Sequence, residues 1–60
     1  MRSVYVFCAD GFEEVEGLTA VDLLRRAGVS VTMVSIMGRT KITGARNISV
    51  NTDILIEDIK

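Results

Sequence analysis

Two hydrophobic segments flank an amphipathic segment in the first half of the chain. Residues 4–9 (VYVFCA) are continuously apolar, which is typical of a strand covered on both faces in a parallel sheet. Residues 29–36 (VSVTMVSI) are rich in β-branched side chains and predict a second strand. Asp10 and Gly11 end the first segment with a turn signal.

The segment between these strands, residues 13–27, is predicted to be a helix. It contains no proline, and Gly28 supplies a stop signal. Glutamates open it and two arginines close it, an order that favours the helix dipole. A strand, a helix and a strand with short links form a right-handed βαβ unit, in which the two strands are parallel.

The second half of the chain predicts shorter elements. Residues 41–43 and 48–50 are expected to pair as a hairpin around residues 44–47, whereas residues 53–60 fit either a strand or the start of a helix. The predicted fold class is therefore α/β, here a βαβ unit plus a hairpin. Because two parallel strands leave a sheet edge unpaired, a further strand is expected shortly after residue 60.

Length and cysteine usage indicate that more polypeptide belongs to this domain. Sixty residues are about half of a common domain length, and small domains that fold alone usually need disulfides, a metal or a partner. The chain has one cysteine and no histidine, which leaves no internal disulfide and no zinc site. We expect residues 1–60 to be the N-terminal part of a single domain whose remainder is absent or in another chain.

Charge and hydropathy exclude several classes of protein. A net charge of −1 argues against nucleic-acid binding, which needs clustered Lys and Arg. The apolar segment at the N-terminus is too short to span a membrane, and no signal-peptide cleavage site follows it, so a cytoplasmic location is expected. The turn at residues 10–16 has one glycine and several carboxylates, which would repel a phosphate. A bound nucleotide is therefore not expected, and no other cofactor or metal is predicted.

The position of Glu16 on the predicted helix is the most informative feature of the sequence. At about 100° per residue, Glu16 falls between Leu23 and Ala27 on the apolar arc, and Glu13 lies near the middle of that arc. Glu14 falls on the opposite, polar side. A carboxyl group among apolar neighbours favours its neutral form, which can donate a hydrogen bond to a thiolate or an oxyanion. For Glu13 and Glu14 the favoured interpretation is solvated first-turn residues.

Two other residues have a structural and a functional interpretation. Cys8 is most simply a small buried hydrophobe, because a nucleophile would need a nearby base and the chain has no histidine. Arg46, in the hairpin region, is most simply a solvated residue; the alternatives are anion binding or a subunit contact.

The run Ala9-Asp10-Gly11-Phe12-Glu13-Glu14-Val15-Glu16, followed by residues 21–28 (VDLLRRAG), resembles the start of the ThiJ/PfpI family, the DJ-one superfamily. The resemblance continues to the end of the chain but covers only the opening part of a family member. It implies a flavodoxin-like sandwich of the class I glutamine amidotransferase type, usually a homodimer. Family members carry their reactive cysteine in a strand-to-helix elbow downstream of these residues.

The resemblance also implies roles for individual residues. Glu16 matches the family glutamate that, when protonated, hydrogen-bonds the reactive cysteine and lowers the pKa of its thiol. Val15, Arg26 and Arg46 match positions at or near the dimer interface. The implied activities are glyoxalase or deglycase chemistry on small reactive carbonyls, redox-dependent stress protection and chaperone behaviour. Peptidase or amidase activity, found in other branches of the family, is the alternative.

A two-component receiver domain is a rival interpretation. Residues 53–60 (DILIEDIK) are similar to a phosphoacceptor strand, with Asp58 as the acceptor and Asp10 and Glu13 as metal ligands. A receiver needs a helix between its second and third strands, and residues 36–52 show no helical period. The missing helix argues against this interpretation.

Overall fold

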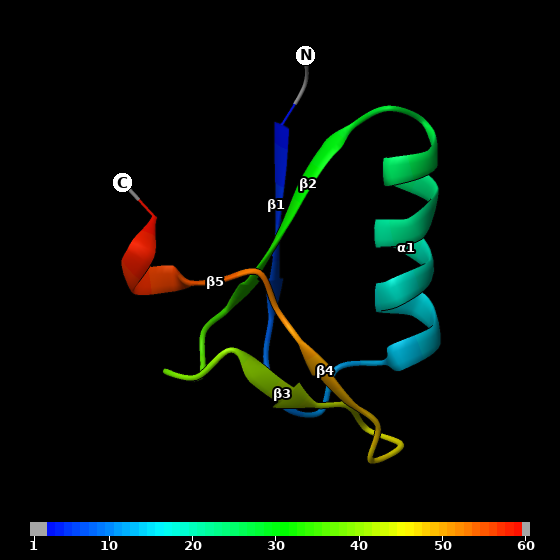
Figure 1. Cartoon of the computed structure of the whole chain (residues 1–60). Helices are drawn as coiled ribbons and strands as arrows, with labels where there is room; N and C mark the ends of the chain where they lie inside the picture. The colour runs from blue at the N-terminus through cyan, green and yellow to red at the C-terminus, as the bar shows by residue number, and fades with distance from the viewer. Residues whose placement is uncertain (1–2, 60) are drawn as a thin grey trace.

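Strands β1 (Ser3–Cys8) and β2 (Ser30–Ser35) lie side by side in parallel, from Ser3 opposite Ser30 to Cys8 opposite Ser35. Helix α1 (Glu14–Arg26) connects the two strands and packs along one face of the pair (Figure 1). The computed structural model describes residues 3–59. The predicted α/β class and βαβ unit are confirmed. Within residues 3–59, no helix is both long enough and apolar enough to cross a membrane.

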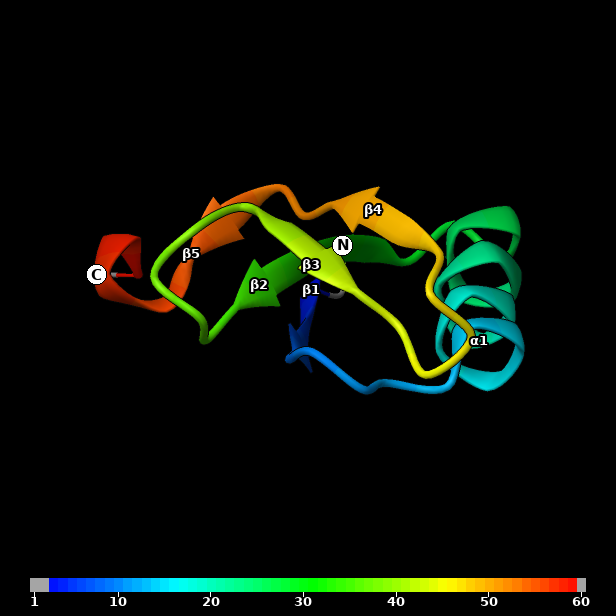
Figure 2. The ribbon, with the colours of Figure 1, turned by 90° about the horizontal axis from the view of Figure 1, so that it is seen from below.

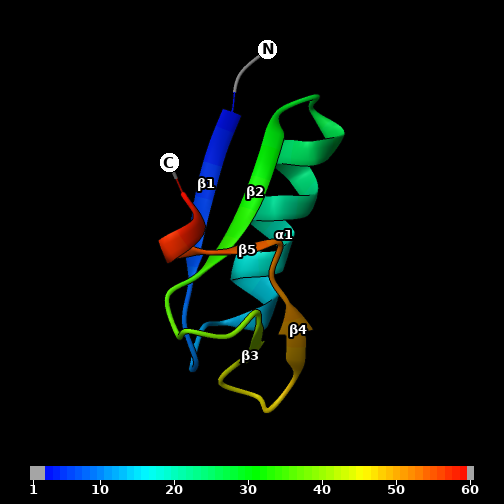
Figure 3. The same cartoon turned by 60° about the vertical axis from the view of Figure 1, so that its left-hand side comes forward.

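The ambiguous C-terminal segment forms a short strand and then a helical turn. Strand β5 (Ile54–Leu55) pairs in parallel with Val34 and Ser35 of β2, and the 3₁₀ turn η1 (Ile56–Asp58) follows. The sheet order is β1-β2-β5, so the outer edge of β1 has no strand partner within the part of the chain that the structure describes. Figures 1 and 3 show the C-terminal turn, drawn in red, on the opposite side of β1 and β2 from α1.

The predicted hairpin is present as β3 (Lys41–Thr43) and β4 (Ser49–Asn51), which pair antiparallel. Its second strand starts one residue later than predicted, because Ile48 closes the turn: the amide of Gly44 donates to the carbonyl of Ile48 at 2.9 Å. The hairpin lies at the end of the molecule where β1 and β2 finish and α1 begins (Figures 1 and 2).

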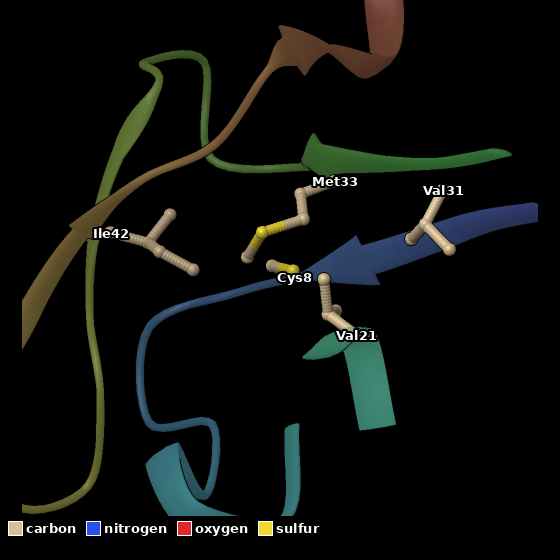
Figure 4. Packing of buried hydrophobic residues seen from close by; sticks show 5 residues of the cluster. All are labelled: Cys8, Val21, Val31, Met33 and Ile42. Atoms are coloured by element: carbon tan, nitrogen blue, oxygen red, sulfur yellow. The ribbon is translucent and has the colours of Figure 1, made fainter. Parts of the chain in front are cut away.

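A small core joins the sheet, the helix and the hairpin. Figure 4 shows its buried members, Cys8 of β1, Val21 of α1, Val31 and Met33 of β2 and Ile42 of β3. Ile42 has no exposed surface, so the hairpin contributes one of its side chains to the same core as the βαβ unit.

The buried face of α1 differs from the predicted one. Val21, at one edge of the predicted apolar arc, and Glu14 beside it are buried, whereas Leu23, at the other edge, is 59 % exposed. The arc is wider than the surface that β1 and β2 offer, so only one flank of it is covered. The expectation of a solvated Glu14 is therefore wrong. Glu16, expected among apolar neighbours, is exposed in this chain.

Candidate functional site

A hollow of about 330 Å³ lies between β1 and the start of α1. Its lining comes from β1, the following turn, the first half of α1 and β2, and is almost entirely apolar; the members are Val6, Phe7, Cys8, Phe12, Glu13, Glu16, Gly17, Val21 and Met33. Three consecutive residues of β1 line it, although alternate residues of a strand face opposite sides. The hollow therefore reaches the edge of β1 that has no strand partner.

Glu13 and Glu16 bring two carboxyl groups to this apolar hollow. Glu13 is the residue before α1, and its side chain makes no capping hydrogen bond. Glu16 lies in the first turn of the helix. Glu16, the acid that the sequence predicted, therefore lies on the lining of this hollow, with its side chain exposed.

Glu14, which the sequence placed on the solvated side, is 4 % exposed and reaches into the β3–β4 turn. Its Oε2 accepts hydrogen bonds from the backbone N–H groups of Arg46 (2.8 Å) and Ile48 (3.2 Å). Burial alone would raise the pKa of Glu14. The backbone N–H donors, including its own, and the charge of Arg46 outweigh burial and hold the pKa below its usual value.

Asp10 ties the turn after β1 to the hairpin. Its Oδ1 accepts from the backbone N–H of Thr43 at 3.0 Å, and its Oδ2 pairs with the guanidinium of Arg39. The Thr43 hydrogen bond contributes most to lowering the pKa of Asp10, against some desolvation and with the help of Arg39. Asp10 thus fixes the segment between β1 and α1 against the hairpin and Arg39.

Cys8 is a buried member of the core, 5 % exposed, and its thiol packs beside Met33 and Val21 (Figure 4). Burial raises the pKa of Cys8, with a smaller contribution from the charge of Asp53 and some opposition from the Val34 backbone hydrogen bond. A neutral, enclosed thiol is a poor nucleophile. The interpretation of Cys8 as a small buried hydrophobe agrees with this placement.

The three expected interface residues lie on the surface and outside the hollow. Val15 is 78 % exposed. Arg26 pairs with Asp22 at 3.0 Å, and the guanidinium of Arg46 lies 4.0 Å from Glu13. All three side chains are accessible to a second protein molecule.

The receiver interpretation needs Asp10, Glu13 and Asp58 at one metal site. Asp58 lies in η1, not at the end of a sheet strand, and its side chain is exposed. No group of three acidic, histidine or cysteine side chains that could hold a metal occurs in residues 3–59. The structure does not bring the proposed receiver residues together.

Comparisons with known proteins identify relatives over nearly the whole chain. The family model described as "DJ-1/PfpI family" matches residues 2–60. The chain is 36 % identical over 57 residues to "Parkinson disease protein 7 homolog" of Danio rerio, covering 95 % of this chain and 30 % of that protein. It is 33 % identical over 58 residues to "Protein dj-1beta" of Drosophila melanogaster, covering 97 % of this chain and 31 % of that protein.

Solved structures show the same arrangement. The oxidized DJ-1 of Toxoplasma gondii superposes with a TM-score of 0.92 at 33 % identity, over 95 % of this chain and 31 % of that one. A cysteine-to-alanine variant of a DJ-1 superfamily protein from Salmonella typhimurium gives a TM-score of 0.93 at 28 % identity, over 97 % and 31 %. The chain thus spans about a third of the length of the relatives it matches.

Proposed function

Because the chain belongs to the DJ-1/PfpI family, we propose that residues 1–60 form the N-terminal part of a cysteine-dependent stress-response protein. Glu16 is the supporting acid in this proposal, and the nucleophilic cysteine comes from polypeptide outside these residues. The complete protein acts on small reactive carbonyls in glyoxalase- or deglycase-type chemistry, and its cysteine also senses oxidation. The redox part draws on the oxidized state of the Toxoplasma gondii relative.

The observation that carries the proposal is the apolar hollow with Glu16 on its lining. The hollow adjoins the unpaired edge of β1, where a further parallel strand fits. Large apolar side chains are exposed on both elements that form the hollow: Tyr5 and Phe7 on β1 are 51 % and 57 % exposed, and Leu23 on α1 is 59 % exposed. Large contiguous apolar surfaces usually mark a missing partner, here the remainder of the same domain.

The chemistry follows from enclosing Glu16 in this hollow. Polypeptide that fills the hollow removes the carboxyl from water, which favours the neutral acid. A neutral carboxyl donates a hydrogen bond to a neighbouring thiolate and stabilises it, so that more of the cysteine is in its nucleophilic form. Cys8 does not take that role, because its thiol is buried in the core.

We extend the proposal to a homodimer with Val15, Arg26 and Arg46 at or near its interface. Their exposure in this chain supports the assignment. Sedimentation of the complete protein tests it: Val15→Glu should shift the protein from dimer towards monomer. An unchanged dimer for a folded Val15→Glu protein contradicts the placement of Val15.

The test of the catalytic role is the pH dependence of thiol alkylation in the complete domain. Glu16→Leu removes the hydrogen-bond donor and should move the alkylation midpoint of the reactive cysteine to higher pH, with mass spectrometry identifying the modified residue. Glu57→Leu, at an exposed glutamate of η1, is the matched control and should leave the profile unchanged. An unchanged profile in a folded Glu16→Leu protein would refute the proposed role.

A further inference from the structure

The β3–β4 turn is built to bind a carboxylate, and the carboxylate it binds is part of the same chain. Within the turn, the amide of Gly44 donates to the carbonyl of Ile48, and the amide of Asn47 donates to the carbonyl of Gly44. Of the other three amides, that of Ala45 donates to the carbonyl of Phe12 at 2.8 Å, and those of Arg46 and Ile48 converge on Oε2 of Glu14. Backbone N–H groups of one turn that point into the same concavity commonly bind an anion in proteins.

The concavity of the β3–β4 turn fits the Glu14 carboxylate closely. A side-chain Cβ at position 44 would overlap the carboxyl group of Glu14, so only glycine leaves the space that the group occupies. Asn47 contributes by adopting a left-handed backbone, with a φ of 65°, which turns the chain back towards β4. The space at position 44 and the hydrogen-bond donors of the turn therefore both fit the Glu14 carboxylate.

Glu14 and Glu16 project from nearly opposite sides of α1. Two residues along an α-helix correspond to a rotation of about 200°. Glu14 is held in the hairpin turn, and Glu16 lines the hollow on the other side. Because the residue before the helix provides no side-chain cap, the Glu14 anchor is the main side-chain restraint seen on the first turn.

We propose that Glu14 is a positioning residue, whose carboxylate in the Gly44–Ile48 turn sets the rotation of the first turn of α1 and thereby aims Glu16 into the hollow. The consequence for thiol reactivity rests on the proposed function; the positioning itself does not. The same anchor fixes the backbone at Arg46, so it also orders the hairpin residue assigned to the interface.

The test uses Glu14→Ala in the complete domain, with formate as a replacement carboxylate and chloride at equal ionic strength as the comparison. Three quantities are measured: hydrogen exchange at the Arg46 and Ile48 amides, the ¹³C chemical shift of the Glu16 carboxyl carbon, and the alkylation profile of the reactive cysteine. Glu57→Ala is the control. If Glu14→Ala does not fold, Glu14→Gln replaces it; because its side chain fills the site and excludes formate, only the amide exchange and the Glu16 carbon signal are then compared with those of the unmodified protein.

The expected result is exchange at least ~10-fold faster at both amides, together with a displaced Glu16 signal, each restored by formate but not by chloride. Faster exchange with an unmoved Glu16 signal would overturn the proposal, because Glu14 would then only hold the hairpin. Failure of formate to restore either quantity would also overturn it. If Glu16→Leu leaves thiol alkylation unchanged, the proposed function fails, whereas the exchange of the two amides and the Glu16 carbon signal still decide whether Glu14 positions Glu16.

Discussion

The carboxyl group of Glu14 occupies the space that any side chain at position 44 would need. Gly44 is buried, and its Cα lies against this carboxyl, which two backbone amides of the same turn hold. A residue without a side chain thus makes room for a buried acid from the helix. The pair joins the start of α1 to the hairpin.

Gly44→Ala should destabilise the domain by about 1–3 kcal/mol, the usual cost of forcing extra atoms into a packed site. The cost should largely disappear in the Glu14→Ala background, because the added methyl group then has space. Denaturant unfolding of the four variants measures this coupling. Gly38→Ala is the control: Gly38 has a φ of 74° and open space around it, so its cost should be the same in both backgrounds. Additive costs for Gly44 and Glu14 would contradict the observed packing.

Stability should fall in acid because of Glu14. Its pKa in the folded chain is lowered, so its contribution is fully present above the unfolded value, ~4.3, and is lost as pH falls through the folded pKa. Glu14→Gln should therefore flatten the acid side of the plot of unfolding free energy against pH. Asp10, whose pKa is also lowered, retains part of the slope. A slope unchanged by Glu14→Gln would show that the carboxylate is not bound in solution as it is here.

The elements that the sequence predicted correctly are those with local signals. The apolar run before Asp10, the helix ending at Gly28 and the hairpin each show a pattern that neighbouring residues determine. Residues 53–60 were ambiguous because β5 exists only through its pairing with β2, a contact that no local pattern encodes.

The partner of Glu14 could not be predicted for a similar reason. Its two donors lie 32 and 34 positions along the chain, and the helical pattern places Glu14 among polar residues. The one sequence signal for a side chain packed against the hairpin is Gly44. A glycine in a hairpin is usually explained by the conformation of the turn alone. In the proposed function, the surroundings of Glu16 include polypeptide outside residues 1–60, so its proposed role derives from the family resemblance and the hollow.

Cys8 should react slowly with iodoacetamide in the native protein. Its burial in the core and its raised pKa both reduce the thiolate available for attack. Unfolding should increase the rate, with the site read by mass spectrometry. Cys8→Ser should cost about 1–3 kcal/mol, because it places a hydroxyl in an apolar core, and Cys8→Ala should cost less than Cys8→Ser. Fast native alkylation, or an equal cost of the two substitutions, would contradict a purely structural role.

Asp53 connects three elements, and two substitutions separate its contributions. Its Oδ2 accepts from the backbone N–H of Met33 at 2.8 Å and pairs with the guanidinium of Arg25 at 3.0 Å. Arg25 also donates to the carbonyl of Val31 at 2.9 Å.

Asp53→Asn keeps an acceptor for Met33 and loses the ion pair, which is half exposed, so it should cost less than about 1 kcal/mol. Asp53→Ala also leaves the Met33 amide without this acceptor, and should cost about 1–2 kcal/mol more. Thermal or denaturant unfolding at low and high salt measures the cost of each substitution. Only the contribution of the Asp53–Arg25 ion pair should decrease at high salt, because salt screens it. Asp22→Asn, which removes the exposed helical pair with Arg26, is the reference at about 0.5 kcal/mol or less. Equal costs for Asp53→Asn and Asp53→Ala would assign the contribution of Asp53 to its charge and contradict the role of the Met33 hydrogen bond.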